Sequence, residues 1–283
     1  MKTISSISQF REWRKGITES VGFVPTMGAF HEGHLSLVQK SNETCNHTVV
    51  SIYVNPKQFA PGEDLIHYPR TLDEDLKKLD SFTVDAVFLP NNEVMYPDGF
   101  STKVNEEILS NFLEGNSRPS FFQGVTTVVA KLFNIIQPSH AFFGEKDAQQ
   151  LAIINRMVTD LNFPIEIISC PLIREENGLA MSSRNVYLSN DEKEVAAHIN
   201  LALEDGKSQL YSGQRDPQII RNIISNHISE QQLLKIDYVS VADANSLTEI
   251  TESISGDILV SVAVYLGDTR LIDNFSYSPS SNK

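Results

Sequence analysis

The sequence predicts an α/β protein with a Rossmann-like parallel sheet flanked by helices and a smaller C-terminal α+β domain. Two observations support this fold class. Over the first part of the chain, continuous apolar runs such as 21–24 and 47–54 alternate with helical segments, a pattern typical of a buried parallel sheet. From Ser189 onward, two long helical segments precede three strand-like runs. We therefore expect a nucleotide-binding domain over 1–174 and a second domain over 175–283.

The composition is that of an ordinary globular protein, with 41% hydrophobic residues in 283. The net charge of −13 argues against nucleic acid or an anionic membrane as a partner. Cys45 and Cys170 are the only cysteines and form no Cys-x-x-Cys motif, which predicts inert thiols in a reducing compartment. Neither a signal peptide nor an apolar run of about 20 residues is present. We expect a cytoplasmic protein with no membrane partner.

The elements of the first domain follow from local patterns. A first helix is expected after Ser6, which with Gln9 has the spacing of a capping box. The expected strands are 21–24, 47–54, 84–90, 141–143 and 165–171. The expected helices are 34–46, 71–79, 124–136 and a segment through 151–158. Ligands of such a sheet bind at the carboxyl ends of its strands.

The second domain is expected to begin with a long helix. Ser189 and Glu192 match the S/T-x-x-E rule for a helix start. The expected elements are helices 190–211 and 217–232 and strands 236–241, 258–266 and 271–275. The polar tail 278–283 is expected to be disordered.

Residues 25–34, P-T-M-G-A-F-H-E-G-H, form the central motif between a strand and a helix. A helix start at such a turn favours anions, because its N–H groups lack internal partners and the helix dipole adds positive charge. Gly28 and Gly33 would allow close approach to a phosphate chain. His31 and His34 are three residues apart and would share one face of the first turn. Two imidazoles there could donate hydrogen bonds to a reacting nucleotide.

Other readings of these residues remain open. The motif could be a plain strand–turn–helix corner with two surface histidines. A zinc site is disfavoured, because H-E-x-x-H places its histidines four apart. The acidic run 73–75 is expected to be a solvated first helical turn, since acidic residues favour helix starts.

Polar segments also follow later strands. Residues 55–59 follow the second strand, and residues 144–150 follow the fourth, with Lys146 on a glycine turn. Lys146 could reach a triphosphate as a mobile charge. The loop 178–185 offers serine hydroxyls and the Arg184 guanidinium, which suit phosphate oxygens. The alternatives are a solvated surface lysine and an ordinary serine-rich turn.

The pattern H-x-G-H resembles the signature of the nucleotidyl-transferase superfamily, and the longer string resembles the pantothenate synthetase (pantoate–β-alanine ligase) family. Further matching strings are 54–59, 68–71, 113–115, 144–147, 149–150, 181–185 and 270–274. The resemblance covers nearly the whole chain. It implies a homodimer of Rossmann domains with lid-like C-terminal domains. It also implies condensation of (R)-pantoate with β-alanine through a pantoyl adenylate, with ATP cleaved to AMP and pyrophosphate and with Mg²⁺.

The same resemblance implies the site residues. The implied ATP-binding residues are Met27, Gly28, Ala29, Phe30, His31, Glu32, Gly33, His34, Gly144, Glu145, Lys146, Asp147, Ile173, Met181, Ser182, Ser183 and Arg184. The expected catalytic residues are His34, in an acid role, with His31, Lys146 and Arg184, which can spread charge on the reacting phosphate. Gln58 and Gln150 match the glutamines that hold pantoate, and Gln58 is also placed near β-alanine. No metal ligand is implied.

One stretch departs from the family pattern. The residues before Gly124 are Phe121-Phe122-Gln123, where the family often has a histidine followed by Phe, and no polar role is expected at 121. Three other functions remain open. A nucleotidyltransferase acting on a phosphorylated coenzyme precursor should lack the two-glutamine pocket, and a tRNA-binding protein would need a basic face. The third is a non-catalytic nucleotide sensor.

Overall fold

The computed structural model describes residues 1–279. The chain forms two compact units. We call residues 1–145 with 150–171 the N-terminal unit, and residues 146–149 with 172–283 the C-terminal unit. Of the tail expected to be disordered, residues 280–283 lie outside the described residues. Among the described helices, none has the length and apolar character needed to cross a membrane.

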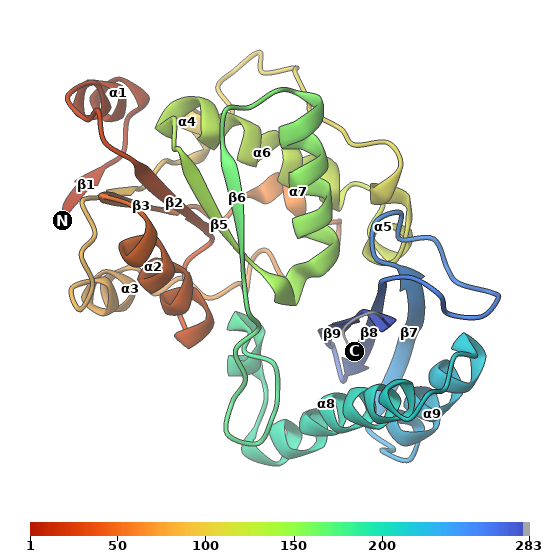
Figure 1. Ribbon diagram of the computed structural model, residues 1–283. Coiled ribbons are helices and arrows are strands. Elements are labelled where there is room, and N and C mark those ends of the chain that lie inside the picture. The colour runs from red at the N-terminus through yellow and green to blue at the C-terminus, as the bar shows by residue number, and fades with distance from the viewer. Residues whose placement is uncertain (280–283) are drawn as a thin grey trace. The chain divides into compact units, whose positions relative to one another are not determined.

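The N-terminal unit contains a six-stranded parallel sheet in the order β1-β4-β3-β2-β5-β6 (Figure 1). Its strands are β1 (Lys2–Ile4), β2 (Val21–Thr26), β3 (His47–Ile52), β4 (Ala86–Phe88), β5 (His140–Gly144) and β6 (Glu166–Cys170). The predicted Rossmann-like sheet is therefore confirmed. The sequence prediction missed β1, a three-residue edge strand too short to show a period of its own.

Helices cover both faces of this sheet. They are α1 (Ile7–Lys15), α2 (Glu32–Thr44), α3 (Leu72–Leu79), α4 (Asn92–Met95), α5 (Glu114–Ser117), α6 (Phe121–Ile136) and α7 (Ala148–Asp160). Short 3₁₀ turns occur at η1 (Pro56–Gln58), η2 (Leu109–Asn111) and η3 (Glu145–Asp147). Strand residues alternate between two cores, as Phe23 packs with α1, α6 and α7 and Val24 packs with α2 and α3. This alternation is the two-residue period of a strand buried on both faces.

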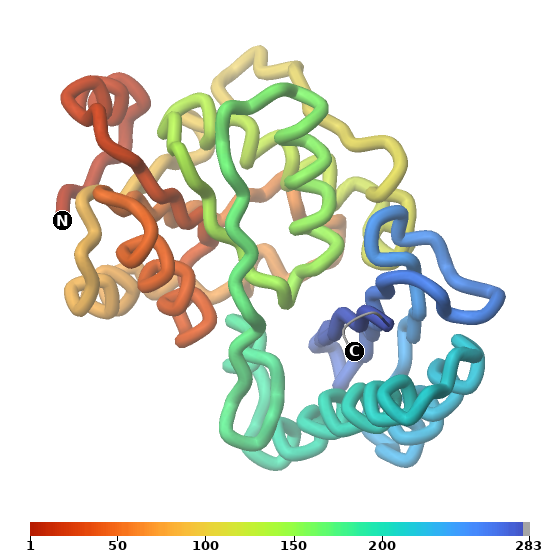
Figure 2. The backbone as a smooth tube through the Cα atoms, viewed as in Figure 1, coloured from red at the N-terminus to blue at the C-terminus, as the bar shows by residue number. Residues whose placement is uncertain are grey.

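The middle of the sheet joins segments that are distant in sequence. Strand β2 pairs with β3 on one side and with β5 on the other. In Figure 2 the red-orange trace of β2 and the green trace of β5 run side by side. Because all these strands are parallel, the segments that follow β3, β2 and β5 meet at one edge of the sheet.

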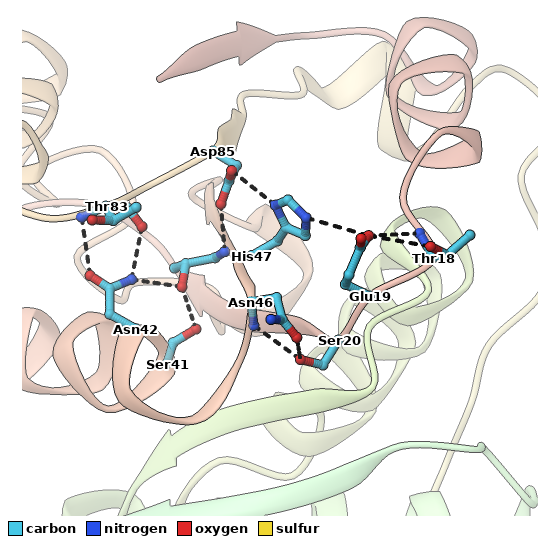
Figure 3. A network of polar contacts seen from close by, with 10 residues as sticks. Thr18, Glu19, Ser20, Ser41, Asn42, Asn46, His47, Thr83 and Asp85 are labelled. Atoms are coloured by element: carbon cyan, nitrogen blue, oxygen red, sulfur yellow. Dashed lines mark hydrogen bonds and ion pairs between the residues drawn. The ribbon is translucent and has the colours of Figure 1, made fainter.

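The opposite edge, where the strands start, is held by a polar network (Figure 3). The Asp85 carboxylate accepts a hydrogen bond from Thr48 N at 2.8 Å and contacts His47 Nδ1 at 3.0 Å. Ser20 Oγ donates to Asn46 Oδ1 at 2.7 Å. These bonds join the residues just before β2, β3 and β4 and so hold the starts of these strands together.

The C-terminal unit contains a three-stranded antiparallel sheet in the order β7-β8-β9. Its elements are η4 (Ser183–Tyr187), α8 (Asn190–Tyr211), α9 (Pro217–Ser229), β7 (Leu234–Asp243), β8 (Ile258–Leu266) and β9 (Thr269–Tyr277). The predicted cap is confirmed, because Ser189 and Glu192 form a reciprocal capping box. Strands β7 and β9 extend two residues beyond each predicted end, because their pairing with β8 continues past the apolar runs on which the prediction was based.

Two helix starts differ from the prediction for local reasons. Helix α2 begins at Glu32 rather than at residue 34, because His31 acts as its N-cap. Helix α6 begins at Phe121 rather than at Gly124. The three residues that depart from the family pattern therefore form its first turn.

Candidate active site

The signature motif forms a tight turn between β2 and α2. Gly28 has φ +86° and Ala29 has φ +53°, in the left-handed region that favours glycine. A Cβ at position 28 would lie 3.0 Å from Asp75 Oδ2 and 3.0 Å from Ile52 Cγ2. The positive φ and the close approach of these protein groups together favour glycine at position 28.

The two signature histidines cap helix α2. His31 Nδ1 accepts a hydrogen bond from Gly33 N at 3.2 Å, and His34 Nδ1 accepts one from His31 N at 3.4 Å. Their ring centroids are 4.1 Å apart. A neutral imidazole that accepts at Nδ1 carries its proton on Nε2. Both rings are therefore Nε2–H donors, the form suited to the hydrogen-bonding role expected from the sequence.

Asp75 corrects one expectation from the sequence. The acidic run 73–75 is not uniformly solvated, because Asp75 is 1% exposed although Asp73 and Glu74 are exposed. Asp75 Oδ2 accepts from Ala29 N at 2.8 Å, and Asp75 Oδ1 accepts from Phe30 N at 2.7 Å. In the structure these two N–H groups therefore bind a protein carboxylate. Sequence analysis missed Asp75, because a helix start also explains an acidic residue.

Gln58 lies in η1, which follows β3, and its side chain is oriented by neighbouring residues. Asn55 Nδ2 donates to Gln58 Oε1 at 3.0 Å, and Gln58 Nε2 lies 3.0 Å from Met27 Sδ. Asn55 is itself held by Tyr96 Oη, which donates to Asn55 Oδ1 at 2.8 Å. Burial raises the pKa of Tyr96, so this phenol stays a neutral donor. The structure thus brings Gln58 against the signature turn, with its NH₂ group directed there.

The backbone of Gln58 is held by an arginine that sequence reasoning did not single out for a role. Arg118 forms two bonds to Glu63, from Nε to Oε1 at 2.6 Å and from Nη2 to Oε2 at 2.7 Å. Arg118 Nη2 also donates to Gln58 O at 3.3 Å. The Phe121 ring lies 3.8 Å from the guanidinium carbon, close enough for a cation–π contact. Phe121 therefore has a supporting, apolar role.

The other predicted residues of the N-terminal unit follow β5. Gly144 ends β5 and Glu145 begins η3, while Gln150 lies in the first turn of α7. Strands β3 and β5 both flank β2. The carboxyl edge of the sheet therefore carries Gln58, the signature turn and Gly144 together.

Lys146 and Asp147 belong to the C-terminal unit. Lys146 Nζ lies 3.6 Å from Asp147 Oδ1, and the lysine side chain is 20% exposed. Asn274 Nδ2, on strand β9, donates to Lys146 O at 2.8 Å. Strand β9 thus positions the backbone of the predicted catalytic lysine.

The remaining predicted ATP-binding residues share one loop of the C-terminal unit. Met181 N donates to Ile173 O at 3.0 Å, which joins two positions that the family resemblance implies for ATP binding. Ser182 caps η4, because its Oγ accepts from Arg184 N at 3.3 Å. The structure therefore brings Ile173 together with the segment 181–184.

This loop is anchored by a buried ion pair that the sequence did not reveal. Arg174 Nη1 and Nη2 contact the Asp273 carboxylate at 2.6 Å and 3.1 Å. Arg174 Nη1 also donates to Gly178 O at 3.1 Å. The Asp273 side chain is 3% exposed. Burial raises the pKa of Asp273, and the Arg174 guanidinium acts in the opposite direction.

The model of the pantoate–β-alanine ligase family matches residues 1–276. The chain belongs to this family. A curated pantothenate synthetase of Clostridium botulinum is 50% identical over 277 residues, covering 98% of this chain and 97% of the relative. The fold agrees with this membership. A crystal structure of pantothenate synthetase from Thermus thermophilus matches with a TM-score of 0.93 and 41% identity, over 97% of this chain and 99% of that one.

A second solved structure contains bound ligands. It is the pantoate–β-alanine ligase of Francisella tularensis, complexed with β-γ ATP and β-alanine. It matches with a TM-score of 0.79 and 35% identity, over 97% of each chain. Family membership and fold therefore agree with the expectations from the signature motif.

Proposed function

We propose that the protein is an ATP-dependent ligase that condenses (R)-pantoate with β-alanine to pantothenate. One observation carries the proposal most directly. The contact between Gln58 and Met27 joins the glutamine expected for pantoate to the turn expected for ATP. The Clostridium botulinum relative named above, 50% identical over 277 residues, supports the same reaction.

The first step activates a carboxylate. A pantoate carboxylate oxygen attacks the α-phosphorus of ATP, and the bond from that phosphorus to the pyrophosphate oxygen breaks. Negative charge on the pentavalent centre increases as the bond forms. The Nε2–H groups of His31 and His34, with the cations Lys146 and Arg184, would donate to this charge. In the second step the β-alanine amine attacks the acyl carbon, AMP leaves, and the amine loses a proton.

Mg²⁺ is part of the proposal. Over residues 1–279, no group of three or more His, Cys, Asp or Glu side chains is arranged to hold a metal ion. The ion would enter with the nucleotide, because Mg²⁺ is commonly held by substrate phosphates and water. The phosphate oxygens of ATP would therefore hold it. When bound, Mg²⁺ neutralises charge on the leaving pyrophosphate.

The finer features of the resemblance belong to the same proposal. The C-terminal unit acts as a lid that excludes water from the adenylate. The protein works as a homodimer in the cytoplasm, with no nucleic-acid partner. The net charge of −13 supports the last point, because nucleic-acid binding requires a basic surface.

The products of the reaction test this function. With ATP, Mg²⁺ and pantoate but no β-alanine, we expect one equivalent of pyrophosphate and an enzyme-bound pantoyl adenylate, measured by mass spectrometry after quenching. Addition of β-alanine should then release AMP and pantothenate. Formation of ADP and orthophosphate would contradict activation through AMP.

Gln58→Ala and Gln150→Ala should each weaken pantoate binding and leave ATP affinity nearly unchanged. An amide can donate to a carboxylate and accept from a hydroxyl, which suits a hydroxy acid. Each lost bond should cost about 1–3 kcal/mol where a polar group is left unsatisfied. Calorimetric titration with both ligands measures this. A variant that loses ATP affinity and keeps pantoate affinity would place its glutamine in the nucleotide half of the site. Gln123→Ala, at the neighbouring start of α6, serves as the control.

A further inference from the structure

Helix α3 holds the signature turn by hydrogen bonds to both the N–H group and the carbonyl oxygen of Phe30. Asp75 Oδ1 accepts from Phe30 N at 2.7 Å, and Lys78 Nζ donates to Phe30 O at 2.6 Å. Asp75 Oδ2 also accepts from Ala29 N at 2.8 Å. Residues 75 and 78 are one helical turn apart and so lie on the same side of α3. Three charge-assisted bonds from a single helix therefore fix residues 29 and 30.

Burial protects these hydrogen bonds from competition with water. Asp75 is only 1% exposed. Thr71 Oγ1 adds a further donor to Asp75 Oδ1 at 3.3 Å. A buried carboxylate is tolerated where several donors satisfy its oxygens. Gly28 completes the fit, because a Cβ there would lie 3.0 Å from Asp75 Oδ2.

Ala29 and Phe30 lie directly before His31, the first of the two signature histidines. Ala29 holds a left-handed conformation, with φ +53°, which costs free energy for a residue with a side chain and persists only when its surroundings enforce it. His31 then begins the cap of α2. The direction of both imidazoles thus depends on a backbone that Asp75 and Lys78 hold in place.

We infer that Asp75 and Lys78 are positioning residues, which set the signature turn so that His31 and His34 meet the nucleotide in reactive geometry. This inference rests on the proposed function for its catalytic consequence. Its structural part, that the α3 bonds order residues 29 and 30, stands on the contacts alone. Misplacement of reacting groups by about 1 Å can cost about 100-fold in rate, which sets the scale of the effect.

Asp75→Asn is the first test. The asparagine amide would place its NH₂ group against the N–H group of either Ala29 or Phe30. One of the two hydrogen bonds is then lost, while the side-chain volume stays nearly constant. We expect kcat/KM for ATP in pyrophosphate release to fall about 10- to 100-fold, with the KM for β-alanine unchanged. Amide hydrogen exchange should speed up at Ala29 and Phe30, a readout that does not depend on activity.

Lys78 gives a second test at an exposed position, where the fold is not at risk. Lys78→Met should lower the adenylation rate several-fold and speed exchange at Phe30, while Lys78→Arg, which keeps a donor, should restore both. Glu74→Gln and Lys77→Met are the matched controls, because both residues are exposed on the same helix. These controls should stay within about two-fold of the parent rate, as surface changes usually do.

The outcomes separate the two claims. Unchanged exchange at Ala29 and Phe30 in Asp75→Asn and Lys78→Met would overturn the inference. So would adenylation rates no lower than those of the two controls, or a loss that Lys78→Arg does not restore. If the parent protein released no pyrophosphate with pantoate, the proposed function would fail, and the exchange data would still decide whether α3 holds the turn.

Discussion

Lys146→Ala should lower the rate of pyrophosphate release by about 100- to 1000-fold, the usual loss when one preorganised charge at a reacting centre is removed. The lysine lies on the turn after β5, with its backbone oxygen held by Asn274 at 2.8 Å. Its charge matters most as the phosphorus becomes pentavalent, so kcat and kcat/KM should fall together. Single-turnover kinetics with ATP and pantoate measure this step directly.

Two variants define the role of Lys146. Lys146→Arg keeps the charge but changes its shape and reach, and should retain part of the activity. Lys103→Ala removes a lysine from an exposed position of the N-terminal unit and should have no effect. If Lys146→Ala changed only the KM for β-alanine, the lysine would act in the second step instead.

Arg174→Met should destabilise the C-terminal unit by about 3–5 kcal/mol, the cost of leaving a buried charge without its partner. Asp273 is 3% exposed, and Arg174 reaches it at 2.6 Å and 3.1 Å. Arg156→Met is the control. Its pair with Asp160 is longer, at 3.7 Å, and both side chains are more than half exposed, so its removal should change stability by at most about 1 kcal/mol. Urea unfolding at pH 7 compares the two variants.

The raised pKa of Asp273 predicts how the destabilisation caused by Arg174→Met depends on pH. Burial raises the pKa of Asp273 in the folded protein, so the folded state holds a proton more readily than the unfolded chain. Stability from this carboxyl is then greatest at low pH and falls as pH rises through the window between the two pKa values. Loss of Arg174 raises the pKa of Asp273 further and widens the window. The loss of stability caused by Arg174→Met should become smaller as the pH is lowered. The double variant Arg174→Met/Asp273→Asn should regain stability at pH 7. A loss of stability that does not change with pH would contradict this account.

Most of the N-terminal fold could be predicted, because its strands and helices carry clear periods. The runs 47–54 and 165–171 are apolar and β-branched enough to mark parallel strands before any contact is known. Strand β1 could not be found in this way, since three residues become a strand only by pairing with β4. The start of α2 was misplaced by two residues because a histidine is an unusual N-cap.

The sequence predicted those site residues whose type and motif indicate the chemistry. It did not predict the residues whose role depends on contacts made only in the folded chain. Gln58 and the signature turn were named from the sequence, and the structure joins them through Met27. Asp75 was read as solvent-facing because its partners, Ala29 and Phe30, lie 46 and 45 residues away in sequence. Arg174 and Asp273 are 99 residues apart. Such pairs leave no local pattern, so only the folded chain reveals them.

The central position of β2 also constrains the order in which the protein can fold. Val21 N donates to Ser139 Oγ, a bond that spans 118 residues. Until β5 has been synthesised, β2 is an edge strand with a row of unpaired backbone groups, a common starting point for aggregation. Closing such a long loop is slow, because its entropy is lost before the contact forms. The edge of the sheet that carries the signature turn is thus completed late, when roughly half of the chain has left the ribosome.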